Sequence, residues 1–151
     1  MARPLRIEYP GAFYHITARG NEQKDIFRDD KDRERFLSYI ETASGRYKAV
    51  IHVYCLMSNH YHLLLSTPEG NLAQIMRHIN GGYTTWFNKR HNRFGHLFQG
   101  KYKAILVDPD VYAGELSAVS QASRRFEAAM KSLMLKRRIE RVRKKLGMSS
   151  V

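Results

Sequence analysis

Two apolar segments separated by only two residues constrain this fold more than any other feature. Residues 49–57 (AVIHVYCLM) and 60–66 (HYHLLLS) are rich in β-branched, aromatic and aliphatic side chains, which favour strands. Ser58 and Asn59 between them are residue types that form tight turns. The whole segment is therefore predicted to be an antiparallel β-hairpin.

His60 and His62 begin the second strand of this hairpin, with Tyr61 between them. Side chains two positions apart on a strand project to the same face, so the two imidazoles are predicted to lie side by side. Two imidazoles with a carboxylate, an amide oxygen or water hold a divalent ion and leave positions for a substrate oxygen. The pair indicates half of a metal site. The alternative is a pair of partly buried histidines that only make hydrogen bonds.

One strand and one helix are expected before the hairpin. Residues 12–17 (AFYHIT) predict the strand. The helix follows, with Asp29 or Asp30 as its cap, apolar residues at spacings of three and four, and an end near Gly45. His15 and His52 are interpreted as structural residues of their strands.

A second helix and strand are expected after the hairpin. Asn71 is expected to cap a helix with a long apolar stripe, which Gly81 and Gly82 interrupt. A glycine pair costs helix stability, so it predicts a kink or a close approach to another backbone. Residues 101–107 (KYKAILV) predict the last strand, and a helical tail is expected from residue 108 onward.

The order strand, helix, strand, strand, helix, strand predicts an α+β fold. Two β-α-β halves of this kind form the ferredoxin-like antiparallel sheet with helices on one face. We expect a domain over residues 1–116 and a basic helical tail over residues 117–151. The uncovered face is suited to a long anion or a second subunit, and the open sheet edges favour a homodimer.

The charge of the chain indicates a polyanionic partner. Lys and Arg number 26 against 14 Asp and Glu, a net charge of +12, which favours nucleic acid. Residues 124–145 hold ten basic and two acidic residues, although a solvated amphipathic helix is the alternative for this segment. The basic residues expected to contact DNA are Arg77, Lys89, Arg90, Arg93, Lys101, Lys103, Arg124, Arg125, Lys136, Arg137 and Arg138.

Composition also predicts where the protein acts. Cys55 is the single cysteine, so neither a disulfide framework nor a cysteine metal cage is available, and a reducing cytoplasmic setting fits best. No apolar run approaches the length of a signal peptide or a membrane span. We expect a soluble protein without a membrane partner.

Three blocks, in this order, resemble the REP-associated tyrosine transposases. They are RPLRIEYPGAFYHITARGN, CLMSNHYHLLLSTPEGNL and INGGYTTWFNKRHNRFGHLFQGKYKAILVD, and together they cover about residues 3–116. These proteins belong to the single-strand transposases with a His-hydrophobic-His metal motif. The resemblance implies a ferredoxin-like nuclease domain that binds hairpin-bearing single-stranded DNA. It also implies that His60 and His62 hold Mg or Mn, and that a tyrosine on the helix after the last strand attacks the phosphate and forms a 5′-phosphotyrosine.

The sequence departs from this family in the helix that should carry the nucleophile. The expected tyrosine, followed by a short His-hydrophobic-Asn-Pro run, is missing, and Tyr112 is the last tyrosine of the chain. An internal deletion after Leu116 accounts for this. Tyr112 is the candidate nucleophile, with packing as its alternative, whereas Tyr83 lies on an apolar stripe and is interpreted as a core residue. Gln121 has the spacing of a third metal ligand in some relatives, but coincidence is the simpler explanation.

Two functions therefore stay open. The first is a metal-dependent transposase that cleaves single-stranded DNA and transfers the strand through a phosphotyrosine. The second is a shortened, inactive remnant that binds hairpin or single-stranded DNA without covalent chemistry. A metalloenzyme for small anionic molecules is a distant third, because nothing else in the sequence builds a pocket.

Overall fold

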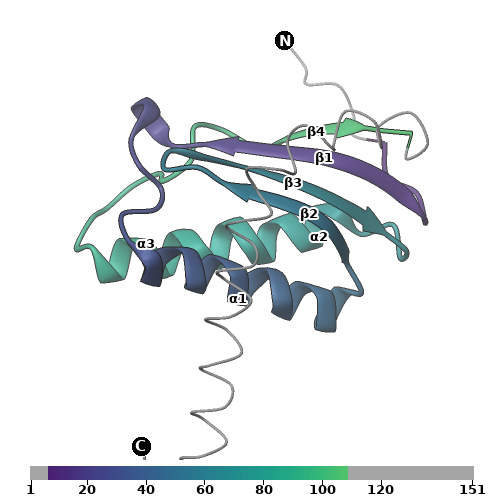
Figure 1. Cartoon of the computed structure of the whole chain (residues 1–151), viewed down its shortest axis with the longest axis horizontal. Helices are drawn as coiled ribbons and strands as arrows, with labels where there is room; N and C mark the ends of the chain where they lie inside the picture. Colours follow the sequence, from purple (N-terminus) through teal and green to yellow (C-terminus); the bar gives the residue numbers. More distant parts are fainter. Residues whose placement is uncertain (1–6, 109–151) are drawn as a thin grey trace, which may run out of the picture. The chain divides into compact units, whose positions relative to one another are not determined.

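The computed structural model describes residues 7–108, so Tyr112 and the basic tail lie outside the described residues. The described elements follow the predicted order (Figure 1). The strands are β1 (Ala12–Arg19), β2 (Val50–Leu56), β3 (His60–Thr67) and β4 (Lys103–Leu106). The helices are η1 (Asn21–Gln23), α1 (Asp30–Tyr47), α2 (Leu72–Met76), η2 (Arg77–Gly81) and α3 (Gly82–Arg90).

The four strands form one antiparallel sheet in the order β2-β3-β1-β4. This is the strand order of the ferredoxin-like fold, and α1 and α2–α3 lie along the same face of the sheet (Figure 1). β3 and β1 are the central strands, so β3, which carries the histidine pair, has a neighbouring strand on both sides. The predicted fold class is confirmed.

Successive side chains along the central strands point alternately to a core face and to an open face of the sheet. Ile16 on β1 and Tyr61, Leu63 and Leu65 on β3 are fully buried against the helices. Tyr61 packs on Phe36 of α1, with ring centroids 4.7 Å apart, and donates a hydrogen bond to Asn80 at 2.6 Å. The intervening side chains face the side that no described helix covers, and we call this the open face.

Helix boundaries follow from local chemistry, with one correction. Asp29 caps α1 as predicted, because its carboxylate accepts a hydrogen bond from the Asp32 amide at 3.0 Å. Asn71 holds the cap position of α2, but its side chain makes no capping bond. Its side-chain Nδ2 instead donates a hydrogen bond to the Tyr47 carbonyl at 3.1 Å, so Asn71 links the start of α2 to the end of α1.

The glycine pair marks a wide turn and a close contact. η2 is a π-helical segment that ends at Gly81, and α3 begins at Gly82. A Cβ on Gly82 would lie 2.6 Å from the Tyr39 ring of α1. The close approach predicted from the sequence is therefore present, although the neighbour is a side chain and not a backbone.

Candidate metal and nucleic-acid site

His60 and His62 lie on the open face of β3, on the same side of the sheet as predicted. Their ring centroids are 5.1 Å apart, and both side chains are half-buried. Tyr61 between them points into the core, where it is fully buried. The strand alternation alone produces this arrangement, since a one-residue shift of register would exchange the histidines with the core tyrosine.

Each imidazole makes its hydrogen bonds through Nδ1. Nδ1 of His60 lies 2.7 Å from the carboxamide oxygen of Asn59. Nδ1 of His62 lies 3.0 Å from Nε2 of His15 and 3.3 Å from the Thr17 hydroxyl, both on β1. Within the described residues, the contacts therefore engage one nitrogen of each ring and leave Nε2 for a ligand.

The surroundings of His62 favour its neutral imidazole. Burial lowers the pKa of His62 from its ordinary value, and His15 and His60 lower it further. The pKa of His15 is also lowered, by burial and then by the positive charge of Lys103. A neutral imidazole is the form that binds a metal ion, so the site is prepared for a cation near neutral pH.

The donor set fits part of the coordination shell of a divalent ion. Two imidazoles suit first-row transition ions such as Mn²⁺, and Mg²⁺ keeps several waters when few protein ligands are present. Over residues 7–108, no group of three His, Cys, Asp or Glu side chains is placed to hold one ion. Further ligands would have to come from elsewhere, such as water or a phosphate oxygen.

Cationic side chains lie across the strands from the histidine pair. Arg19 of β1 is the direct partner of His60, and it is exposed. Lys103 of β4 is paired with Thr17, which is in turn the partner of His62. Directly paired residues share a face, so both cations flank the site. The sequence predicted Lys103 but missed Arg19, because only the strand register places it opposite His60.

The loop 91–100 meets the sheet at the same end. Its backbone pairs with the end of β1, since the Gln99 amide donates to the Arg19 carbonyl and the Asn21 amide donates to the Leu97 carbonyl, each at 2.8 Å. Phe94 in this loop has 91% of its surface exposed. An aromatic ring this exposed contributes nothing to the described core and is available for stacking.

The other predicted DNA contacts are spread over the surface. Lys89 and Lys101 are exposed, and Arg77 is exposed on the helical layer, on the opposite side of the sheet from the histidines. Arg90 makes ion pairs with Asp29 and Asp32, each at 2.6 Å. Arg124, Arg125, Lys136, Arg137 and Arg138, like Tyr112 and the predicted domain boundary after Leu116, lie outside the described residues.

Arg93 and Tyr83 have structural contacts. Arg93 donates to the Asn88 carboxamide at 2.8 Å and lies over the Phe87 ring. Tyr83 is fully buried, and its hydroxyl donates to the Ile26 carbonyl. Burial raises the pKa of Tyr83 well above its ordinary value, which disfavours the phenolate that a nucleophile needs. Its predicted place in the core is what the structure shows.

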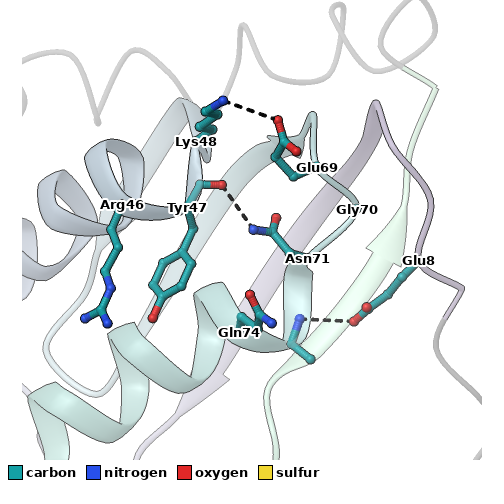
Figure 2. Close-up of a pocket in the computed structure, with 9 residues that line it drawn as sticks. Glu8, Arg46, Tyr47, Lys48, Glu69, Gly70, Asn71 and Gln74 are labelled. Carbon is teal, nitrogen blue, oxygen red and sulfur yellow. Dashed lines mark hydrogen bonds and ion pairs between the residues drawn. The ribbon is translucent and has the colours of Figure 1, made fainter.

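A pocket of about 690 Å³ lies at the other end of the sheet, beyond the end of β3 (Figure 2). Its polar groups pair with one another: Lys48 lies 3.7 Å from Glu69, and Glu8 accepts a hydrogen bond from the Ala73 amide at 3.0 Å. These contacts tie the lead-in segment and the turn after β3 to the helices.

No helix of the described part of the chain combines the length and apolar character needed to cross a membrane. No curated protein matches the sequence. Several solved structures resemble the fold, and two of them are described as transposases. One is titled a REP-associated tyrosine transposase bound to a REP hairpin, with a TM-score of 0.61, 12% identity, and 76% of this chain and 68% of that chain covered. The other is a candidate transposase from Deinococcus radiodurans, with a TM-score of 0.54, 14% identity, and 80% and 97% covered.

The family comparison covers most of the chain. Residues 9–117 match the family described as IS200-like transposases, a span that includes the whole sheet, all the described helices and the histidine pair. The order of the strands and the two solved transposase structures agree with this match. This chain belongs to the IS200-like transposase family.

Proposed function

We propose that the protein cleaves and rejoins single-stranded or hairpin DNA, with Mg or Mn held by His60 and His62. One observation carries the proposal: two imidazoles share the open face of the central strand β3, and each makes its described hydrogen bonds through Nδ1 alone. Hairpin DNA is supported as the ligand because one similar structure is titled as bound to a REP hairpin.

A phosphodiester is charged and resists attack, so its cleavage needs positive charge beside the developing negative charge. A divalent ion bound at the histidine pair would supply this charge and orient the ester. Arg19 and Lys103 flank the pair and would contact the phosphates on either side of the scissile bond. These contacts hold the strand in place without reading its sequence.

Tyr112 is the proposed nucleophile. Its phenol oxygen would lose a proton and form a bond to phosphorus. The bond from phosphorus to the 3′ oxygen of the preceding nucleotide would break, and that oxygen would take up a proton. The product is a 5′-phosphotyrosine with a free 3′-hydroxyl, and the bond energy is kept for rejoining.

The loop 91–100 would hold unpaired bases next to the site. Phe94 offers a stacking surface, and Lys101 and Lys103 continue the positive charge into β4. Stacking on an aromatic ring beside basic residues is a common mode of single-strand binding. The basic tail, with Arg124, Arg125, Lys136, Arg137 and Arg138, would add phosphate contacts.

The open edge of β4 is the proposed contact with a second copy of the chain. Ile105 is 46% exposed and Leu106 is 37% exposed, both on this edge strand. A homodimer would cover these apolar side chains. Light scattering of the protein, compared with an Ile105→Lys variant, tests this proposal, because a charge at the edge should favour the monomer.

A second function is favoured by the sequence after β4. The run that should follow the nucleophile is missing, so a DNA-binding remnant without covalent chemistry is the alternative. Incubation of the protein with labelled hairpin-bearing single-stranded DNA and Mn²⁺ separates the two. A protein–DNA adduct that survives denaturant, and that Tyr112→Phe abolishes, supports the transposase. DNA binding without any adduct supports the remnant.

A further inference from the structure

His15 on β1 contacts His62 on β3, a contact that no spacing in the sequence predicts. Thr17 is the direct partner of His62, so His15 is its diagonal neighbour on the same face. The two rings are stacked, with centroids 5.2 Å apart and planes 29° apart. Nε2 of His15 lies 3.0 Å from Nδ1 of His62, which is a hydrogen-bond distance.

The direction of this bond decides whether His62 can bind a metal ion. A neutral imidazole has one nitrogen that donates and one that accepts. If Nδ1 of His62 donates to Nε2 of His15, the lone pair of His62 lies on Nε2 and faces outward. If the bond runs the other way, Nε2 of His62 carries the proton and cannot be a ligand.

The same reasoning applies to His60, whose partner atom can only accept a hydrogen bond. The carboxamide oxygen of Asn59 lies 2.7 Å from Nδ1 of His60, so this nitrogen carries the proton and Nε2 carries the lone pair. Both rings present the same nitrogen to an ion only when Nδ1 of His62 carries its proton, and His15 is the nearer acceptor for that proton. The Thr17 hydroxyl, 3.3 Å from the same Nδ1, is able to accept as well.

We propose that His15 is a positioning residue of the metal pair, which accepts the Nδ1 proton of His62 and fixes the orientation of that ring. This inference rests on the proposed metal site. His15 acts through His62, because its Nε2 faces Nδ1 of His62 and not the outward Nε2 of that ring. Partners of this kind determine the tautomer of metal-binding histidines and strengthen metal binding.

His52 provides a matched comparison on the same sheet. It is also a strand histidine, it stacks on Phe13 with centroids 5.0 Å apart, and it lies 3.0 Å from the Ser66 hydroxyl. Ser66 is near the far end of β3 from His60. His52 therefore makes a ring contact and a hydrogen bond on the sheet without touching the metal pair, although it is more exposed than His15, and it separates general sheet stability from positioning.

The test is a Mn²⁺ titration followed by the electron paramagnetic resonance of free Mn²⁺, with melting temperatures to check folding. The full chain is compared with His15→Ala, His15→Gln, His52→Ala and His60→Ala. His15→Ala should weaken Mn²⁺ binding by about ten- to a hundredfold. His15→Gln should bind close to wild type, because its amide oxygen reaches the place of Nε2 and accepts the same proton. His52→Ala should leave binding unchanged.

Each outcome bears on one of two claims. Wild-type affinity in His15→Ala, an equal loss in His15→Gln, or an equal loss in His52→Ala overturns the positioning role. A wild-type protein that binds no Mn²⁺, or a His60→Ala variant that binds as wild type does, overturns the metal site itself and this inference with it.

Discussion

The carboxylate of Asp32 and the guanidinium of Arg90 lie 2.6 Å apart, although 58 residues separate them in the sequence. Asp32 is fully buried near the start of α1 and also accepts hydrogen bonds from His91 at 2.9 Å and from the Arg28 amide at 2.8 Å. Arg90 is the last residue of α3. These ion pairs and hydrogen bonds link α1 to α3 at the point where the loop 91–100 begins.

Asp32→Ala should therefore destabilise the protein strongly. Loss of the carboxylate leaves Arg90 and His91 without their buried partner, and breaking such a pair costs about 3 kcal/mol. Urea unfolding followed by circular dichroism measures this cost. The control is Asp30→Ala on the same helix, whose exposed carboxylate lies 3.9 Å from Arg33 and should contribute less than about 0.5 kcal/mol. Equal losses in the two variants would contradict the structural role of Asp32.

Asp29 should make the stability of the protein dependent on acid. The hydrogen bond from Arg90 holds the pKa of Asp29 at about 2, below its ordinary value of 3.8. A carboxyl pKa that is lower in the folded protein adds stability at pH values above the ordinary pKa. This stability is lost as the pH falls towards the pKa of the folded protein. The melting temperature should fall less steeply between pH 4 and pH 2 in Asp29→Asn than in the wild type. The asparagine keeps a capping side chain, so the cap itself is retained. Parallel curves would show that Asp29 does not contribute.

The residues whose roles depend on local spacing could be predicted from the sequence. The two-residue turn at Ser58 and Asn59, the same-face placement of His60 and His62, and the Asp29 cap all follow from chain geometry within a few residues. The fold class follows from the order of such elements. The family resemblance then linked the histidine pair to DNA chemistry.

The residues whose roles depend on tertiary contacts could not be predicted. Asn71 has the right residue type and position for a helix cap. Its side-chain Nδ2 instead donates a hydrogen bond to the Tyr47 carbonyl, which lies within reach. The ion pairs of Arg90 with Asp29 and Asp32 join residues about 60 positions apart, so no local pattern indicates them. His15 contacts His62 only because β1 lies beside β3 in a register that no local pattern determines.

Phe94→Ala should weaken the binding of single-stranded DNA without changing stability. The ring is 91% exposed, so its loss removes no core packing. Stacking of one base contributes about 1–3 kcal/mol, which corresponds to roughly tenfold or more in the dissociation constant. Fluorescence anisotropy with a labelled oligonucleotide measures the effect. Tyr9→Ala is the control, because Tyr9 is 48% exposed beside the turn after β3, at the far end of the sheet.

Lys103→Ala and Arg77→Ala should differ in the salt dependence of DNA binding. Lys103 lies beside the histidine pair, whereas Arg77 is on the helical layer. Removing one phosphate contact should reduce the slope of log affinity against log salt by about one. We expect this reduction in Lys103→Ala and an unchanged slope in Arg77→Ala. A reduction in Arg77→Ala alone would place the DNA on the helices.

The most direct test of the metal site on this fold is the cleavage of labelled hairpin-bearing single-stranded DNA in Mn²⁺ by the wild type and by His60→Ala. We predict that the wild type cleaves, and that His60→Ala loses cleavage while it keeps salt-sensitive DNA binding. A His60→Ala protein that cleaves as fast as the wild type would contradict the account.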